Sequence, residues 1–262
     1  MQEPIAFLSS TDLKSGEDRL VNEGWAVLQP QAIAGGIENV LRHFGTPILQ
    51  PNGKMLHEVT VDYNAPKDPL LQSKGNGAIG PHTEGVTHDP PPRYLALYCH
   101  RQARCGGGQT LLSDGFGFYN SLSEDLRIHA SSDPVDFHET KKKLDRSLHE
   151  GQSLLSKLKT LARNWKASGK PEVVYRSLAN APIMDMQGDQ RIVRYSFNLF
   201  RFVDEGTPLH QIVHMGKNYF YENCSAILIP EKHMLIWDNY RMMHARSEYT
   251  DSARHLTRYW LN

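Results

Sequence analysis

The sequence predicts a mixed α/β protein that is mainly β. Short apolar runs bounded by glycine, proline or polar clusters recur along the chain, which is typical of buried strands. These runs are residues 24–28, 94–99, 109–113, 192–202, 226–230 and 234–237. A few stretches with helical spacing of apolar residues lie between them. The length of 262 residues allows one or two domains, and one large domain with a sizeable core would account for the whole chain.

Helices are expected at three places. Residues 31–44 carry apolar side chains at helical spacing but include two adjacent glycines. Residues 115–129 also have a helical pattern, in which Ser123 is a suitable N-cap. Residues 139–168 form a charged amphipathic stretch, expected as a helix on the outside of a sheet. Residues 64–81 are rich in proline, glycine and asparagine and predict a long loop.

The composition excludes several classes of protein. Lysine plus arginine and aspartate plus glutamate each number 29, so the formal net charge is zero, which argues against a nucleic-acid partner and a polybasic membrane anchor. No apolar run approaches the roughly 18–20 residues of a membrane span. The N-terminal segment lacks the pattern of a signal peptide. Three cysteines with no CxxC pair favour a reducing setting. We therefore expect a cytoplasmic protein with a small-molecule partner.

A histidine and a glutamate at short spacing form a candidate metal site. Of the thirteen histidines, His82 alone is followed two residues later by an acidic residue, Glu84. On a strand, residues i and i+2 point to the same side, so the imidazole and the carboxylate would converge. Such a pair needs one more histidine to complete a 2-His-1-carboxylate site, which suits Fe(II) and leaves coordination positions open.

The C-terminal segment offers that histidine together with two arginines. His244 follows a buried-looking strand. Basic and apolar residues alternate over 254–260, which predicts a strand with Arg254, Leu256 and Arg258 on one face. The other face would carry His255, Thr257 and Tyr259. A guanidinium is the natural bidentate partner of a carboxylate, so this strand could hold a dianionic co-substrate.

Six segments, spread in order over roughly residues 20–262, together resemble the TauD/TfdA-type iron(II)- and 2-oxoglutarate-dependent dioxygenases. They are G-P-H-T-E-G at 80–85, P-P-P-R-Y-L-A-L-Y-C at 90–99, G-G-G-Q-T-L-L-S-D at 106–114, Y-N-S-L-S at 119–123, W-D-N-Y-R-M-M-H-A-R at 237–246 and R-H-L-T-R-Y-W at 254–260. The resemblance implies a double-stranded β-helix, or jelly roll, with flanking helices. It also implies a single domain over 1–262, with a helical insertion at about 139–168.

The resemblance also implies roles for individual residues. His82, Glu84 and His244 would hold iron, with 2-oxoglutarate and O2 as co-substrates. Thr110, in G-G-G-Q-T where the family more commonly has G-G-D-T, matches a threonine that helps to bind 2-oxoglutarate. Arg254 matches the arginine that pairs with its distal carboxylate, and Arg258 matches a second arginine that often faces the substrate. Glutamate at position 84 is typical of the clavaminate-synthase-like branch; it makes a sulfonate substrate less expected and argues against a halogenase.

The function predicted from these features is oxidation, by default hydroxylation, of an unactivated C–H bond in a small polar metabolite. An amino acid or an amino-acid-derived natural-product intermediate is the expected substrate, by analogy with the family. Desaturation or cyclisation within the same family is the alternative outcome. Other classes are a zinc hydrolase using His82, Glu84 and His88, and a non-catalytic jelly-roll binding module. Residues 64–81 and 139–168 are expected to close over the site as a lid. The oligomeric state is not predicted.

Overall fold

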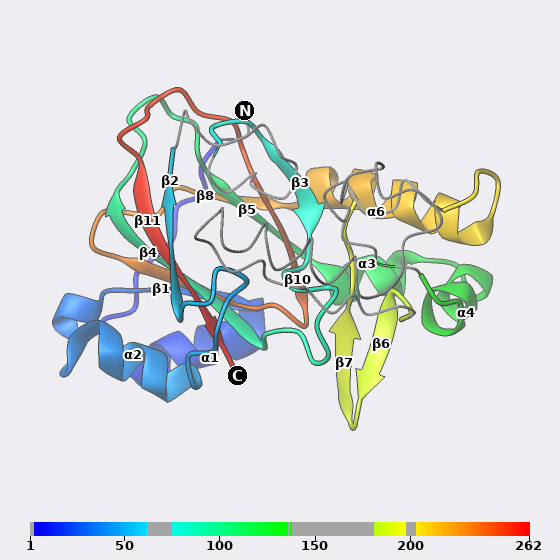
Figure 1. The fold of residues 1–262 in the computed structure, drawn as a ribbon, viewed down its shortest axis with the longest axis horizontal. Coiled ribbons are helices and arrows are strands. Elements are labelled where there is room, and N and C mark those ends of the chain that lie inside the picture. Colours follow the sequence, from blue (N-terminus) through cyan, green and yellow to red (C-terminus); the bar gives the residue numbers. More distant parts are fainter. Residues whose placement is uncertain (1–2, 62–74, 136, 138–180, 198–202) are drawn as a thin grey trace, which may run out of the picture.

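Two antiparallel β-sheets packed face to face form the centre of the protein (Figure 1). The structure is a computed structural model, and it describes residues 3–61, 75–135, 137, 181–197 and 203–262. The mainly β class and the jelly-roll architecture predicted from the sequence are confirmed. The expected helix at 139–168 and most of the loop at 64–81 lie outside the described residues. None of the described helices is long and apolar enough to cross a membrane.

The larger sheet contains five described strands in the order β1-β9-β4-β11-β2. Their bounds are β1 Trp25–Leu28, β2 Leu56–Thr60, β4 Tyr94–Arg101, β9 Met234–Asp238 and β11 His255–Leu261. Neighbouring strands are antiparallel, with Trp25 opposite Trp237 and Thr257 opposite both Tyr98 and Glu58. Because β1 and β11 belong to one sheet, the two ends of the chain are joined through it.

The smaller sheet has the order β3-β10-β5-β8, and a separate hairpin joins β6 to β7. The bounds are β3 Ile79–His82, β5 Thr110–Asp114, β6 Met184–Gln187, β7 Gln190–Val193, β8 Ser225–Ile227 and β10 Met242–Arg246. In the β3–β10 pair, His82 lies opposite His244. This register brings together two histidines that are far apart in the sequence.

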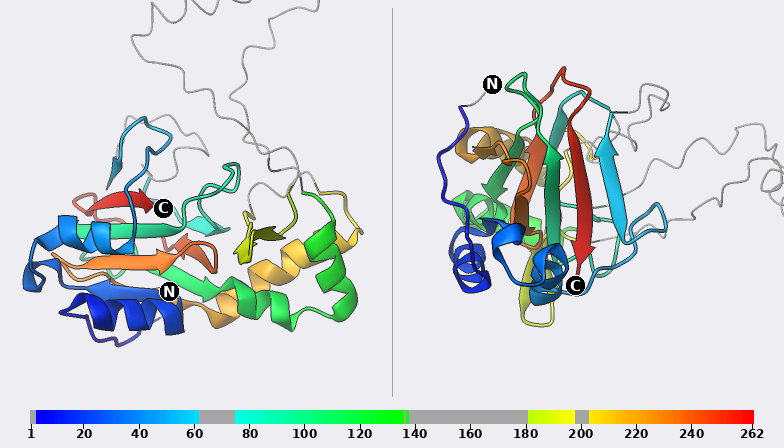
Figure 2. Two further views of the ribbon diagram at one scale, coloured as in Figure 1. Left: turned by 90° about the horizontal axis from the view of Figure 1, so that it is seen from below. Right: turned by 90° about the vertical axis from the view of Figure 1, so that its left-hand side faces the viewer.

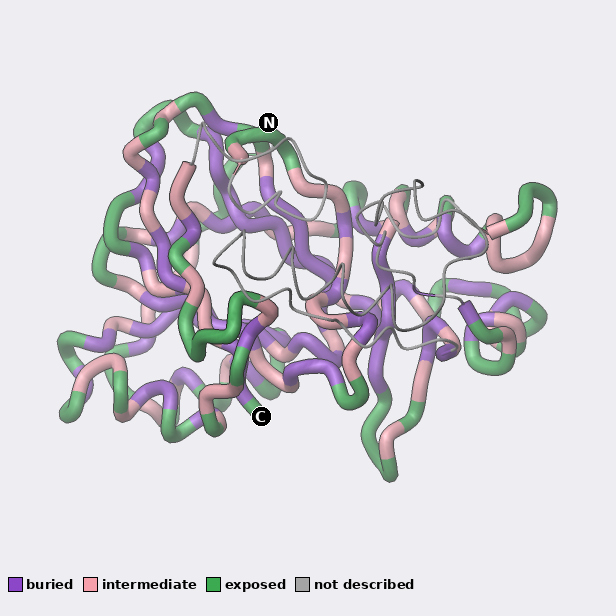
Figure 3. Tube along the Cα trace, in the orientation of Figure 1, coloured by how far each residue is buried: buried purple, intermediate pink, exposed green. Residues whose placement is uncertain are grey.

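Apolar side chains from both sheets fill the space between them, and the strands are mainly buried (Figure 3). The inward-facing residues include Leu95, Leu97 and Cys99 of β4 and Leu112 of β5. Alternation along each strand sends the intervening side chains to the outer face. Helices lie against part of each outer face (Figure 2), and two further apolar clusters pack there.

Helices α1 (Leu13–Glu23) and α2 (Gly36–Phe44) pack on the larger sheet. The Asp12 side chain caps the start of α1. Gly24, with φ of 81°, lets the chain leave this helix directly into β1. The predicted helix at 31–44 is shorter than expected because Gly35 has φ of 77°, so α2 begins at Gly36 after a 3-10 turn at Pro30–Ala32.

On the other side, α3 (Gly115–Ser121), α4 (Glu124–Ser132) and α6 (Pro208–Asn223) pack on the smaller sheet. The single helix expected at 115–129 is two helices, because Ser123 adopts an extended backbone and caps α4. Its predicted capping role is therefore right. Helix α6 and helix α1 were not predicted from the sequence. The described part of 192–202 contains strand only up to Val193, and β3 begins inside the expected loop.

Candidate active site

His82, Glu84 and His244 converge in a cavity that is lined by residues of both sheets. Nε2 of His82 lies 3.9 Å from Oε2 of Glu84, and Nε2 of His244 lies 3.7 Å from the same oxygen. The two imidazole ring centroids are 4.0 Å apart. One ligand atom from each residue lies within 4.8 Å of the others. Three side chains of this kind, so arranged, can hold a divalent metal ion.

His82 and Glu84 were expected to converge because both would lie on one strand, and this expectation is wrong. Strand β3 ends at His82, and Glu84 lies in the turn that follows. The two side chains therefore do not converge through strand alternation. Instead, the turn brings the Glu84 carboxylate back beside His82, and the β3–β10 register adds His244. The H-x-E spacing identified the right residues, although the local structure differs from the prediction.

Asn239 fixes the backbone of Glu84. The Glu84 N–H donates to Oδ1 of Asn239 at 2.8 Å, and Nδ2 of Asn239 donates to the Glu84 carbonyl at 3.0 Å. The same amide nitrogen donates to the carbonyl of Pro92 at 2.9 Å. Asn239 is 1% exposed, so these are buried hydrogen bonds. From the sequence, Asp238-Asn239 is expected only as a turn that holds the strand before His244, and the contact of Asn239 with Glu84 was not predicted.

His82 carries a neutral ring at neutral pH. Burial lowers its pKa to about 4, and the neighbouring His244 acts in the same direction. Nδ1 of His82 lies 2.9 Å from the carbonyl of Gly80, so an N–H at this position donates to that oxygen. Nε2 is then the lone-pair nitrogen and faces Glu84. A neutral imidazole oriented through its other nitrogen is the form that binds metal ions.

Arg258 contacts Glu84 directly. Its Nη1 lies 3.0 Å from Oε2 of the carboxylate, and its Nε donates to Oε1 of Gln50 at 2.9 Å. Burial by itself would raise the pKa of Glu84, but the Arg258 guanidinium and the two imidazoles hold that pKa below its usual range. Glu84 is therefore ionised at neutral pH. A contact between Arg258 and substrate, expected from the sequence, stays a prediction.

Arg254 and Thr110 lie in the same cavity, whose volume is about 70 Å³. Arg254 is 2% exposed, and burial lowers its pKa below the usual range. Its Nε and Nη1 have no hydrogen-bond partner among the described residues. A buried guanidinium with unpaired donors fits a carboxylate ligand. Thr110, the first residue of β5, is also buried and lines this cavity.

The glycine run before Thr110 makes room for Arg254. Gly108 has φ of 73°, and a Cβ there would lie 2.8 Å from Nε and 2.9 Å from Cδ of Arg254. A Cβ at Gly107 would lie 2.2 Å from the carbonyl oxygen of Glu248. Gly107 and Gly108 are therefore required by the close approach of the backbone to the segment that carries Arg254, whereas a Cβ at Gly106 would meet nothing within 4 Å.

His88, the third residue of the hydrolase alternative, is not in this group. Its ring packs edge-on against Trp260 at 5.4 Å, and the described group pairs His82 and Glu84 with His244. A larger cavity of about 480 Å³ lies between α1, α2 and α3. Its charged groups are already paired, as Arg241 with Asp114 and Arg93 with Asp238. The smaller cavity, which contains His82, Glu84 and His244, is therefore the candidate active site.

Comparison with known proteins identifies the family. Residues 8–173 match the model of the taurine catabolism dioxygenase TauD, TfdA family. The chain belongs to this family. It is therefore an Fe(II)- and 2-oxoglutarate-dependent dioxygenase, as its motifs predicted. No curated protein sequence matches the dioxygenase.

Solved structures of low sequence identity share the fold of the dioxygenase. Asparagine oxygenase in complex with Fe(II), (2S,3S)-3-hydroxyasparagine and succinate has a TM-score of 0.69 at 15% identity, covering 95% of this chain and 77% of that one. The non-heme iron oxygenase OrfP with Fe has a TM-score of 0.61 at 17% identity, covering 94% and 78%. The PvcB protein from Pseudomonas aeruginosa has a TM-score of 0.60 at 13% identity, covering 95% and 80%.

Proposed function

We propose that the dioxygenase hydroxylates a free amino acid or an amino-acid-derived metabolite, with iron held by His82, Glu84 and His244. The main support for an iron site is that these three side chains converge in the cavity that also contains the buried guanidinium of Arg254. Two neutral imidazoles and one carboxylate are the ligand set that suits Fe(II), and they leave coordination positions open. Bound Fe(II), with 2-oxoglutarate and oxygen, supplies the oxidising power that breaks an unactivated C–H bond.

The protein's own residues bind and orient the reactants in this proposal. Nε and Nη1 of Arg254 donate to the distal carboxylate of 2-oxoglutarate, and the Thr110 hydroxyl donates to the same co-substrate. Leu95, Leu97 and Leu256 line the cavity and exclude water. Asn239 holds the Glu84 backbone, so the metal ligand does not shift when the co-substrate enters.

The substrate class rests on two kinds of support. Asparagine oxygenase was solved with a hydroxylated asparagine, and OrfP with (3S)-hydroxy-L-arginine and succinate. Both share the fold of this chain. Arg258 lies at the cavity wall and has the charge to pair with an amino-acid carboxylate. Hydroxylation adds one oxygen atom to the substrate, whereas desaturation or cyclisation removes two hydrogens, so the product mass distinguishes these outcomes.

The domain organisation and the cellular setting are also part of this proposal. We infer a single domain over residues 1–262 with a helical insertion at about 139–168, and the sheet that β1 shares with β11 supports this inference. The setting is cytoplasmic, and the partner is a small molecule. The chain has only three cysteines and no CxxC pair, which suits a reducing compartment.

Succinate formation from 2-oxoglutarate under air tests the proposed function. The purified chain, supplied with Fe(II), is screened against amino acids and small acids, with His82→Ala as the inactive control. We expect turnover that rises with one class of panel member and disappears in the variant and after chelation. Binding of 2-oxoglutarate without turnover would mean that the panel lacks the substrate. Equal turnover in His82→Ala would contradict the proposed iron ligands.

A further inference from the structure

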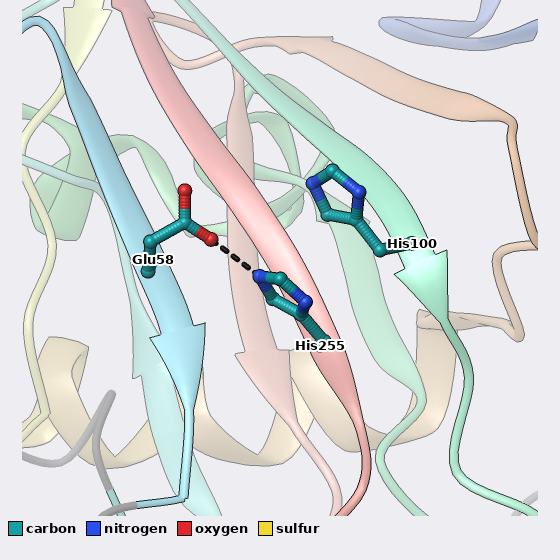
Figure 4. A group of neighbouring side chains, drawn as sticks. All are labelled: Glu58, His100 and His255. Atoms are coloured by element: carbon teal, nitrogen blue, oxygen red, sulfur yellow. Dashed lines mark hydrogen bonds and ion pairs between the residues drawn. The ribbon is translucent and has the colours of Figure 1, made fainter.

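A second group of metal-ligand side chains lies on the outer face of the larger sheet. Glu58 of β2, His100 of β4 and His255 of β11 point toward one another from three neighbouring strands (Figure 4). One ligand atom from each lies within 4.8 Å of the others. Nε2 of His255 and Oε2 of Glu58 are 2.5 Å apart. We propose that Glu58, His100 and His255 form a second divalent-metal site, of the kind that takes Zn²⁺.

This group is separate from the cavity that holds His82, Glu84 and His244. Val59, Leu97 and Leu256 belong to the same three strands and line that cavity on the inner face. Because side chains alternate along a strand, Glu58, His100 and His255 lie on the opposite face. The two metal-ligand groups are therefore on opposite sides of one sheet, and the second is open to solvent.

The sheet register explains why the three side chains meet. Thr257 lies opposite Glu58 in β2 and opposite Tyr98 in β4. The pairing of β11 with β4 is irregular between His255 and Leu256. His255 pairs with Arg101, but Leu256 pairs with Cys99, so the register skips His100. This irregularity places His100 beside His255 on the outer face. Their rings stack with centroids 4.4 Å apart and an interplanar angle of 23°.

Thr257 contacts both Glu58 and His100 on the side of the group that faces the sheet. Its hydroxyl donates to the Glu58 carboxylate at 3.2 Å and lies 2.8 Å from Nε2 of His100. Thr257 is buried, so these contacts are made at the floor of the group and not in open water. An ion pair between Glu58 and His255 does not need His100, whereas a metal site uses all three side chains.

The chemistry of the group favours a borderline divalent ion. Two imidazoles and one carboxylate are ligands of Zn²⁺, with water in the fourth position of a tetrahedral site. Ligand atoms in such a site are about 3.3 Å apart, given metal–ligand distances of about 2.0–2.1 Å. In the structure, one ligand atom from each of the three side chains lies within 4.8 Å of the others, which is near this spacing.

A metal ion at this position would stabilise β2, the edge strand of the described sheet. Strand β2 is the last strand in the order and contributes Val59 to the core, while its other side chains are exposed or half-buried. Coordination by Glu58, His100 and His255 would link β2 to β11 and β4 through their side chains. Because only the folded chain presents the three ligands together, metal binding would raise the unfolding temperature.

Zinc titration of the full chain tests the site without relying on the proposed iron centre. In the double variant His82→Ala/His244→Ala, calorimetry should detect one equivalent of bound Zn²⁺, and Co²⁺ should give the absorption bands of a tetrahedral site. Adding His100→Ala and His255→Ala should weaken binding by at least about tenfold. It should also abolish the rise in unfolding temperature caused by Zn²⁺.

Two controls separate the site from general histidine binding. His129→Ala removes a half-buried histidine whose Nδ1 is 2.7 Å from a carboxylate oxygen of Asp133, with no third ligand among the described residues. This change should leave Zn²⁺ binding unaltered. Glu58→Gln keeps the side-chain shape but removes the charge, and it should weaken binding.

Three outcomes would contradict the proposed Zn²⁺ site. They are no Zn²⁺ binding to His82→Ala/His244→Ala, unchanged binding after His100→Ala and His255→Ala, or an equal loss in His129→Ala. If the background variant does not fold, the stoichiometry of the parent chain decides instead. It should fall from two equivalents to one in His100→Ala/His255→Ala, and an unchanged stoichiometry would overturn the site. Loss of the iron centre alone would leave the His100-dependent equivalent in place.

Discussion

The side-chain amide of Asn239 hydrogen-bonds both the N–H and the C=O of Glu84, at 2.8 and 3.0 Å. Glu84 itself lies in a turn, where the backbone has no strand partner to fix it. Asn239 therefore replaces the missing ladder hydrogen bonds at a buried position. These two hydrogen bonds fix the backbone from which the Glu84 side chain extends toward the two histidines.

Asn239→Ala should lower both stability and metal affinity. The change leaves a buried N–H and two carbonyls without that partner, at an expected cost of about 2–4 kcal/mol in unfolding free energy. Urea unfolding measures the first effect and Fe(II) or Mn²⁺ titration the second. Asn223→Ala is the control, because Asn223 is exposed and its side-chain amide donates to the carbonyl of Tyr219 within its own helix. Equal stability and equal metal affinity of the two variants would contradict the positioning role.

Gly108→Ala and Gly106→Ala should differ, although both residues have positive φ. Gly106 has φ of 78° and open space at its Cβ position, whereas a Cβ at Gly108 would meet Arg254. Both variants carry backbone strain of about 1 kcal/mol. Only Gly108→Ala should also displace Arg254 and raise the KM for 2-oxoglutarate, by at least about tenfold. Matching KM values in the two variants would show that Arg254 does not depend on this space.

Arg254→Met should remove 2-oxoglutarate binding without unfolding the protein. Nε and Nη1 of the buried Arg254 guanidinium have no hydrogen-bond partner among the described residues, so the variant should be as stable as the parent or more stable. Its unfolding temperature should no longer rise with 2-oxoglutarate.

Arg246→Met provides the contrast in the same cavity. Nη2 of Arg246 donates to the carbonyls of Gly75 and Gly77 at 2.8 and 2.6 Å, so its removal should cost about 1–3 kcal/mol. Thermal unfolding with and without 2-oxoglutarate measures both variants. A strongly destabilised Arg254→Met would contradict the account of Arg254 as an unpaired buried charge.

The cysteines should differ in reactivity with pH. Hydrogen bonds from the backbone of Thr250, Gly107 and Asp251 lower the pKa of the exposed Cys105 thiol to about 7, whereas burial raises the pKa of Cys99 to about 12. The thiolate is the reactive form, so alkylation of Cys105 should increase as the pH rises through about 7 and then level off. Cys99 should react only on unfolding.

Mass spectrometry of a Cys224→Ser background, with Cys105→Ser as control, follows each thiol separately. The structure predicts one labelled site in the folded protein at about pH 8. Labelling that still increases steeply above pH 9, or that persists in Cys105→Ser, would contradict the hydrogen bonds to the Cys105 sulfur.

Local patterns in the sequence predicted the strands β1, β4, β5, β9 and β11 and several site residues, whereas β2, β3 and β10 were not predicted as strands. The alternation over 254–260 correctly separates Leu256, in the core, from His255 on the outer face. The H-x-E pair and the segment around His244 indicated the three side chains that converge. Helices α1 and α6 were missed, although Asp12 and Thr207 are N-caps that could have indicated them.

The sequence by itself determined the fold class, the family and the residue types of the metal-ligand group, because alternation, glycine positions and short motifs are local properties. Tertiary structure alone decided that a turn delivers Glu84 to His82, that Asn239 holds this turn, and that Arg258 contacts the carboxylate. It also decided that Glu58, His100 and His255 meet on the outer face. These contacts join residues that are mostly far apart in the chain, and they depend on strand register, which no local pattern specifies.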